Sequence, residues 1–250
     1  MAKTALNYEL NFIDTVSTLA PITSQLIFKK ETHEDQTKTI EIKANDVTRS
    51  LLYTMSAPEK YFNFQGNNFA LIDYTKFNSY FNTFRPKEAE KAPLLSTEPD
   101  AEGEPAFVYI NSQISTAQIK QTLANIDVIA KPIFETINEG NADTDFEFTE
   151  AEFSELKKMV SMLDADSAKF TVNGDVVTVC LFSTRSADKF DKQYKANVTA
   201  ETPFELVCPS KAISLIPDGA YRVTIDKDGL VVFHQKREDE IVLTLYVAEK

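Results

Sequence analysis

The sequence TDFEFTEAEFSELKKMVSML, residues 144–163, decides the fold of this chain. Phe146 and Phe148 alternate with polar residues, which is the pattern of a short, half-buried strand. Thr149 stands three residues before Glu152, the spacing of a capping box in which each side chain satisfies a free amide at a helix N-terminus. The helix that follows presents one apolar stripe at helical spacing, formed by Phe153, Leu156, Met159, Val160 and Leu163. The stretch therefore predicts a strand followed directly by an amphipathic helix.

The residues after this helix change to a two-residue apolar period, which predicts strands. Three are expected, at AKFTVNG (168–174), DVVTVCLFST (175–184) and QYKANVT (193–199), with a tight turn at Asn173-Gly174-Asp175. The same order then recurs as a strand at 204–208, a short helix at 209–216, and strands at 220–226, 230–236 and 241–248. Two copies of a unit made of one strand, one helix and three strands thus fill residues 143–250.

The first half repeats these elements with weaker signals. Helices are predicted at about 12–19 and 74–84, and strands at 24–30, 38–44, 50–57, 106–111 and 115–123. Residues 86–105 contain six acidic residues, which predicts a solvated loop or a flexible insertion. The polar stretch 135–145 is the predicted interdomain linker, with a boundary near residue 140. The fold class expected from the whole pattern is α+β.

Composition excludes several classes of function. The chain has 250 residues and a net charge of −12, which no uniformly basic nucleic-acid binder has. Two histidines (His33, His234) and two cysteines (Cys180, Cys208) are too few for a zinc ribbon or a disulfide framework. The six glycines form no phosphate-binding motif, and no segment has the apolar character of a signal peptide or a membrane span. We therefore expect no cofactor, no metal, no membrane association and a reducing, cytoplasmic location.

The second half resembles a known family. The segment FEFTEAEFSELKKMVSML, the later stretch FELVCPSKAISLIPDGAYRVTIDKDGLVVFHQ and the final IVLTLYVA resemble the C-terminal domain of DNA polymerase sliding clamps of the two-domain tailed-phage type. The most specific feature is the turn formed by Pro217, Gly219 and Tyr221 between the short helix and the last three strands. Residues 1–140 resemble the family only in the order of elements, and the acidic segment 86–105 departs from it.

The resemblance implies the sliding-clamp fold. An N-terminal clamp domain (1–140, with the acidic insertion) and a C-terminal clamp domain (141–250) would each contain two βαβββ units, with antiparallel sheets outside and helices lining a ring. Such a clamp is a homotrimer that encircles double-stranded DNA without sequence preference and tethers a DNA polymerase, which makes it a processivity factor. It catalyses no reaction, needs no cofactor and is opened by an ATP-dependent clamp loader. If the chain is encoded by a phage, it would serve viral DNA replication in the host cell cytoplasm.

A net charge of −12 suits a DNA-encircling role only if the charge is segregated. Encirclement separates retention from affinity, so a few basic side chains on the inner helices are sufficient, and strong phosphate contacts would slow sliding. The residues predicted to face DNA are Lys76, Arg85, Lys87, Lys157, Lys158 and Lys211. The alternative is that these cations lie on ordinary solvated faces. The first predicted helix weakens the case, because residues 11–24 contain Asp14 and no basic residue.

A second functional surface would bind client proteins. Partners of clamps insert short peptides with apolar anchors, and the resemblance places the pocket near Tyr246, Val247, Pro217 and Ile133. The alternative is that the tyrosine and the valine belong to the core of a final strand. Ring closure also requires a sheet edge on each subunit that pairs with the next.

Other functions explain fewer features. His33 is predicted to lie in an exposed hairpin loop and His234 on the polar side of a strand, while both cysteines lie in apolar strand runs. A hydrolase based on cysteine and histidine is therefore not favoured. The main alternative is a noncatalytic acidic β-rich structural protein or a DNA mimic that inhibits a nucleic-acid enzyme. Mass separates the two readings, because three copies of the 28.1 kDa chain give about 84 kDa.

Overall fold

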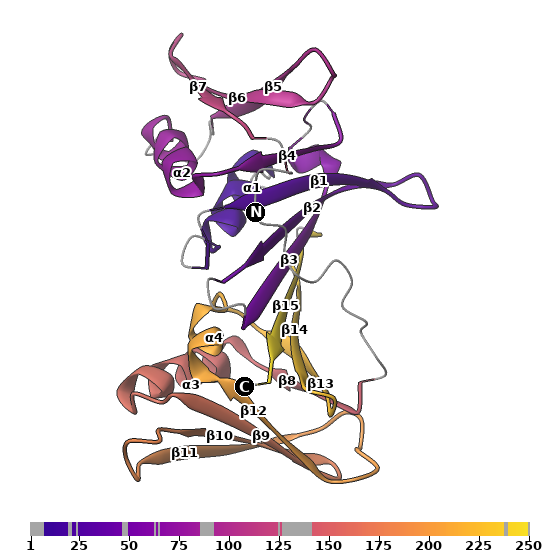
Figure 1. Ribbon diagram of the computed structural model, residues 1–250, viewed down its shortest axis with the longest axis vertical. Coiled ribbons are helices and arrows are strands. Elements are labelled where there is room, and N and C mark those ends of the chain that lie inside the picture. Colours follow the sequence, from indigo (N-terminus) through magenta and orange to yellow (C-terminus); the bar gives the residue numbers. More distant parts are fainter. Residues whose placement is uncertain are drawn as a thin grey trace, which may run out of the picture. The chain divides into compact units, whose positions relative to one another are not determined.

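The computed structural model is an α+β fold of antiparallel sheets and short helices (Figure 1). It describes residues 8–19, 22–23, 25–46, 50–62, 64, 66–85, 93–124, 126, 142–237 and 240–249. These residues fall into two compact units, formed mainly by the residues before 127 and by those after 141. Residues 45–46 and 50–53 belong with the second unit, and residues 240–241 with the first. The expected α+β class is thereby confirmed.

The elements before residue 127 follow the expected order of helices and strands. They are α1 (Tyr8–Ser17), β1 (Leu26–Thr32), β2 (Lys38–Asn45), β3 (Leu51–Pro58), the 3-10 helix η1 (Glu59–Tyr61), β4 (Asn68–Leu71), α2 (Tyr74–Thr83), β5 (Leu94–Pro99), β6 (Pro105–Asn111) and β7 (Gln118–Thr122). Strands β4, β1, β2 and β3 are neighbours in that order, and β5, β6 and β7 form a separate sheet. The first helix begins four residues earlier than its apolar pattern predicts.

Aromatic side chains fill the core of the first unit. Phe28 on β1 stacks on Phe69 on β4, with ring centroids 4.6 Å apart. Phe12 on α1 lies 6.4 Å from Phe28 and 6.1 Å from Phe62, and its side chain is fully buried. Burial of an aromatic side chain of this size contributes roughly 1.5–3 kcal/mol. This cluster therefore holds α1 against the sheet.

The second unit contains the strand, helix and three-strand order twice, as the sequence predicts. Its elements are β8 (Thr144–Phe148), α3 (Glu150–Met162), β9 (Ser167–Asn173), β10 (Val176–Phe182), β11 (Lys189–Lys195), β12 (Phe204–Pro209), α4 (Ser210–Leu215), β13 (Tyr221–Asp226), β14 (Leu230–Lys236) and β15 (Val242–Ala248). One sheet contains β15, β14, β13 and β8, and the other has the order β11, β10, β9 and β12. Gly174 has φ +61° in the β9–β10 turn, a left-handed conformation that favours glycine.

Phe153 anchors α3 in the core of the second unit. Its ring centroid lies 5.6 Å from Phe148 on β8, 4.9 Å from Tyr221 on β13 and 5.9 Å from Phe233 on β14. The Tyr221 hydroxyl donates a hydrogen bond of 2.7 Å to the carbonyl of Pro217. The tyrosine of the predicted turn therefore joins the end of α4 to the same aromatic cluster.

The acidic segment 86–105 differs from the prediction of a solvated loop or flexible insertion. Residues 93–105 are described, and within them Leu94–Pro99 form β5, which pairs with β6. The loop that follows is closed by Asp100, whose carboxylate accepts hydrogen bonds from the amides of Glu102 and Glu104. The Glu104 carboxylate in turn accepts from the amide of Asn67 at 3.0 Å. The prediction of a loop is therefore wrong for β5, while residues 86–92 lie outside the described residues.

Two further predictions concern the linker between the units and a membrane span. The predicted linker 135–145 lies outside the described residues up to position 141, and its last residues, from Thr144, belong to β8. Among the described helices, none combines the length and the apolar character needed to cross a membrane.

Candidate functional site

Helix α3 is fixed at its start by the predicted capping box. The amide of Glu152 donates to Thr149 Oγ1 at 3.3 Å, and the amide of Thr149 donates to the Glu152 carboxylate at 3.0 Å. This backbone hydrogen bond lowers the pKa of the Glu152 carboxyl below its ordinary value. Because Phe153, Leu156 and Val160 are buried, the opposite side of the helix faces solvent.

Lys157 lies on α3, but its ammonium group is not free. Its Nζ donates to the carbonyl oxygen of Ile216 and to the carboxylate of Asp218, both at 2.8 Å. Only 22% of the Lys157 side chain is exposed. The carbonyl lies at the end of α4, where unpaired carbonyl oxygens attract a cation. This lysine therefore joins α3 to the end of α4, and Asp218 neutralises its charge.

An open depression of about 290 Å³ lies between α3 and α4, which are side by side in Figure 1. It is lined by Ser154, Lys157, Lys158, Ser161, Ser214 and Asp218. Lys158 is exposed and its ammonium group has no partner in the described part of the chain. The same holds for Lys211 on α4. The depression thus combines hydroxyl groups with a free cation at its rim, which suits an anionic ligand.

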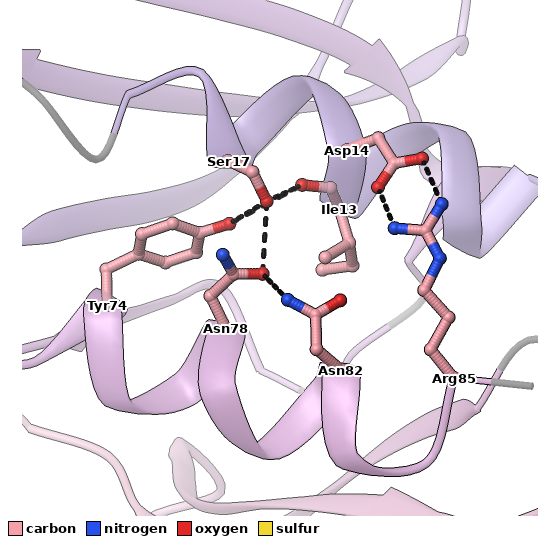
Figure 2. A network of polar contacts seen from close by, with 7 residues as sticks. All are labelled: Ile13, Asp14, Ser17, Tyr74, Asn78, Asn82 and Arg85. Carbon is pink, nitrogen blue, oxygen red and sulfur yellow. Dashed lines mark hydrogen bonds and ion pairs between the residues drawn. The ribbon is translucent and has the colours of Figure 1, made fainter.

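A polar seam joins α1 to α2 in the first unit (Figure 2). Ser17 Oγ lies 2.7 Å from the carbonyl oxygen of Ile13, 3.0 Å from the Tyr74 hydroxyl and 3.1 Å from the side-chain oxygen of Asn78. The side-chain amide of Asn82 donates to the same Asn78 oxygen at 3.2 Å. Burial raises the pKa of the Tyr74 hydroxyl, so this group stays protonated. Neutral hydrogen bonds therefore join α1 to α2 at this point.

Arg85 lies just beyond the end of α2 and pairs with Asp14 on α1. Its two terminal nitrogens donate to the two carboxylate oxygens at 2.8 and 3.0 Å, as Figure 2 shows. This bidentate arrangement is the strongest geometry for an arginine and a carboxylate. The charge of Arg85 is consequently neutralised within the unit, as that of Lys157 is in the other.

Lys76 is the remaining described cation of the first helix pair. It is exposed near the start of α2, and its Nζ lies 5.7 Å from the ring centroid of Tyr80. Its backbone amide donates to the Asp73 carboxylate at 2.9 Å, which caps the helix. Lys87, also predicted to face DNA, lies outside the described residues.

The helices are nearly neutral in a strongly acidic chain. Together the four helices hold four lysines and five acidic residues, whereas the whole chain has a net charge of −12. On α3, Lys192 of β11 pairs with the carboxylates of Glu152 and Glu155 at 3.6 and 2.9 Å. Of the cations predicted from the sequence, Lys76, Lys158 and Lys211 have no acidic partner in the described residues. The sequence reasoning missed Asp14 and Asp218 as partners of the other two.

The residues predicted to bind client peptides lie in different environments. Val247 on β15 is 1% exposed and belongs to the core, so its side chain offers no accessible surface. Tyr246 and Pro217 are partly exposed, and the Pro217 carbonyl is already occupied by Tyr221. Ile133 lies outside the described residues.

Both cysteine thiols are held in their protonated form, and His33 contacts a threonine. Burial raises the pKa of the Cys208 thiol to about 12 and that of Cys180 to about 11, so neither forms a thiolate near neutral pH. His33 lies at the tip of the β1–β2 hairpin, as predicted, and its Nε2 is 2.8 Å from Thr39 Oγ1. Within the described ranges, no cluster of three histidine, cysteine or acidic residues has the arrangement of a metal site.

The two smaller sheets each have one edge that can accept a further strand. In an antiparallel ladder, alternate residues direct their amide and carbonyl groups toward the neighbouring strand, and the others direct them away. In the first unit this edge strand is β7. The amide of Leu123, just after β7, donates a hydrogen bond of 2.9 Å to the carbonyl oxygen of Ala106 on β6. Counting back from that bond in the β6–β7 register, Gln118, Lys120 and Thr122 direct their backbone groups away from β6.

The corresponding edge of the second unit is β11. The amide of Ala196 donates to the carbonyl of Asp175 at 2.8 Å, which sets the alternation in the β10–β11 register. The residues whose backbone groups point away from β10 are therefore Lys189, Asp191, Gln193 and Lys195. The opposite edges, β5 and β12, end in Pro99 and Pro209, which have no amide hydrogen to offer a further strand. β5 and β12 thus each lack one amide hydrogen, at their final residue, whereas β7 and β11 contain no proline and keep an amide at every position.

Comparison with known proteins gives the fold. No protein-family model and no curated protein matches this sequence. Among solved structures, the chain is similar to the crystal structure of PCNA from Thermococcus kodakaraensis, with a TM-score of 0.71 and 12% sequence identity. The match covers 97% of each chain. At this identity the similarity establishes a shared fold, so the resemblance of the C-terminal half extends to the whole chain.

Proposed function

We propose that this chain, which has the sliding-clamp fold, is a DNA sliding clamp. In this role it encircles double-stranded DNA and tethers a DNA polymerase, which makes it a processivity factor without catalytic activity. The observation that carries the proposal is the match to PCNA over 97% of the chain, because a match of this extent spans both units. A fold alone does not fix a function, so the proposal also relies on the charge of the helices.

The charge arrangement supports loose contact with DNA. Each neutralised phosphate adds about 0.9 to the slope of log affinity against log salt, so many tight contacts would oppose sliding. The helices carry only three described cations without an acidic partner, namely Lys76, Lys158 and Lys211. Ser154 lines the same depression as Lys158, and a serine hydroxyl can donate a hydrogen bond to a phosphate oxygen at little electrostatic cost. In our proposal these three lysines face the DNA, with Lys87 as a further candidate.

The sheet edges support assembly into a ring. A strand edge on one subunit and a different edge on the next make a head-to-tail contact, which closes into a ring when the rotation fits. The intact edges β7 and β11 lie in different units of the chain, so pairing β7 of one copy with β11 of the next satisfies both. We propose that this contact builds a homotrimer, the arrangement that the resemblance to phage clamps implies.

The partners follow from the proposed role. They are double-stranded DNA, a DNA polymerase and an ATP-dependent clamp loader, and the compartment is the cytoplasm in which replication takes place. The exposed parts of Tyr246 and Pro217 remain the proposed contact for client peptides, together with Ile133. The buried Val247 would support that surface from the core rather than touch the peptide.

The proposal is tested by mass and by primer extension. Light scattering should give about 84 kDa, three times the 28.1 kDa chain, and the protein should increase product length on circular primed DNA with its cognate polymerase and loader. Lys158→Glu should reduce that increase, whereas Lys38→Glu, which makes the same charge change at an exposed position of β2, should leave it closer to the unchanged protein. A monomer that has no effect on extension would instead favour the acidic structural protein or DNA mimic.

A further inference from the structure

Both helix pairs contain the same ion pair with its polarity reversed. In the first unit, Asp14 on the first helix of the pair binds Arg85, which lies two residues beyond the end of α2. In the second unit, Lys157 on the first helix of the pair binds Asp218, which lies three residues beyond the end of α4. The acid and the base have exchanged places, but the connection between the elements is the same.

Both pairs are open to solvent on the acidic side. The Asp14 side chain is 45% exposed and that of Asp218 is 63% exposed. Ion pairs with this degree of exposure contribute little to folding stability, because solvent and salt screen them. Their effect on charge is larger. Without the two acids, the described helix pairs would present five uncompensated cations instead of three.

The partners of the two cations are therefore well placed to regulate contact with DNA. A phosphate that approached Arg85 would compete with a bidentate carboxylate at 2.8 and 3.0 Å. A phosphate that approached Lys157 at the depression between α3 and α4 would compete with Asp218 at 2.8 Å. Each cation is therefore partly exposed to solvent, while a carboxylate neutralises its charge.

We propose that Asp14 and Asp218 are built-in counter-ions that withhold Arg85 and Lys157 from the DNA phosphates and so keep the contacts weak enough for sliding. This inference rests on the proposed clamp function. It assigns two acidic residues a role in controlling the strength of DNA contact. It also predicts that removing an acid from the helix pairs strengthens DNA contact more than removing an acid elsewhere.

The test compares the full-length protein with Asp14→Asn and Asp218→Asn. Asparagine keeps the size of the side chain and one oxygen acceptor but removes the charge. The matched control is Glu205→Gln, because Glu205 pairs with Lys169 at 3.0 Å on strands β12 and β9 and its loss changes the net charge by the same amount. Affinity for a fluorescent linear duplex is measured by anisotropy over a range of salt concentrations.

Each helix variant should raise the slope of log affinity against log salt by about 0.9 for every subunit whose face meets the DNA. When the salt is lowered from about 200 to about 50 mM, its affinity for DNA should therefore rise roughly three- to fourfold more than that of the unchanged protein. Rings loaded on DNA should also diffuse more slowly. Glu205→Gln should match the unchanged protein. If Asp14→Asn and Asp218→Asn bind no more tightly than Glu205→Gln, the inference is overturned.

Double variants separate a counter-ion from a structural link. Asp14→Asn with Arg85→Gln, and Asp218→Asn with Lys157→Gln, remove both charges and should return the salt slope to that of the unchanged protein. A purely structural link would not be restored by losing its second partner. Primer extension with the unchanged protein separates the two proposals. No trimer and no stimulation would refute the clamp function, whereas normal stimulation with unaltered DNA affinity in the variants would refute only the counter-ions.

Discussion

The edge of β11 offers a selective way to test ring assembly. The backbone amide of Gln193 points away from β10, because Tyr194 is paired with Val177 in the alternation set by Ala196. Replacing Gln193 by proline removes an amide hydrogen for which the described residues of the subunit provide no acceptor. Proline is tolerated at a sheet edge when its nitrogen faces outward. The substitution should therefore affect pairing between subunits more than folding of the subunit.

The expected magnitude follows from one broken ladder bond. A backbone hydrogen bond contributes about 0.5–1.5 kcal/mol net, and the carbonyl left without a partner at a closed interface costs about 1–3 kcal/mol. A loss of roughly 2–3 kcal/mol at each interface weakens it about 30- to 150-fold, since about 1.4 kcal/mol is a factor of ten. A ring contains this contact at every interface, so the effect is repeated around it.

Light scattering over a dilution series measures the result. Gln193→Pro should dissociate at a higher protein concentration than the unchanged chain, and Gln193→Ala, which keeps the amide, should not. Lys192→Pro is the opposite control, because the Lys192 amide faces β10 and its loss should lower the folding stability of the unit itself. Equal oligomer stability in the proline and alanine variants of Gln193, with circular dichroism unchanged, would refute the assignment of β11 as an interface strand.

Three further predictions concern folding and reactivity. Phe153→Ala should reduce the free energy of unfolding by about 3–5 kcal/mol in urea titrations, and a Phe153→Leu variant that loses as much would contradict the aromatic contacts given above. Thr149→Ala should cost about 1 kcal/mol near neutral pH. The pKa of the Glu152 carboxyl is lowered in the folded state. The part of the cost that Glu152 contributes is therefore present above its unfolded pKa of about 4.3 and disappears as the pH falls through its folded pKa. Equal costs at pH 7 and about pH 3 would argue against this contribution of Glu152. Cys180 and Cys208 should react with a thiol reagent at about pH 8 only after denaturation, and rapid labelling of the native protein would contradict their raised pKa values.

The second unit was predictable because its local signals agree with its fold. A capping box, an apolar helical stripe and a glycine with positive φ in the β9–β10 turn mark α3 and the hairpin after it. The strand β5 gave no such signal. Its side chains are half-buried or exposed, so its sequence, LLSTEP, has no alternation between apolar and polar positions. Its pairing with β6 depends on residues that a local pattern does not contain.

The candidate site was predictable in part for a similar reason. Helical periodicity correctly put Lys158 on the exposed side of α3, opposite the buried Phe153. It could not find the partners of Lys157 and Arg85, because these acids lie 61 and 71 residues away in the chain. Whether a surface cation is free or compensated depends on tertiary contacts, and a helical pattern does not include them.

Pairing between two different strands, β7 and β11, would also give the assembly a direction. If β7 of one copy pairs with β11 of the next, the contact is head-to-tail, and every open chain of copies still carries an unpaired β7 at one end and an unpaired β11 at the other. In the proposed ring every β7 and every β11 is paired, so closure removes the two free strands that a dimer or an open filament would keep at its ends. A loader that opens such a ring would expose one edge of each kind, and these two edges would reclose on each other without guidance.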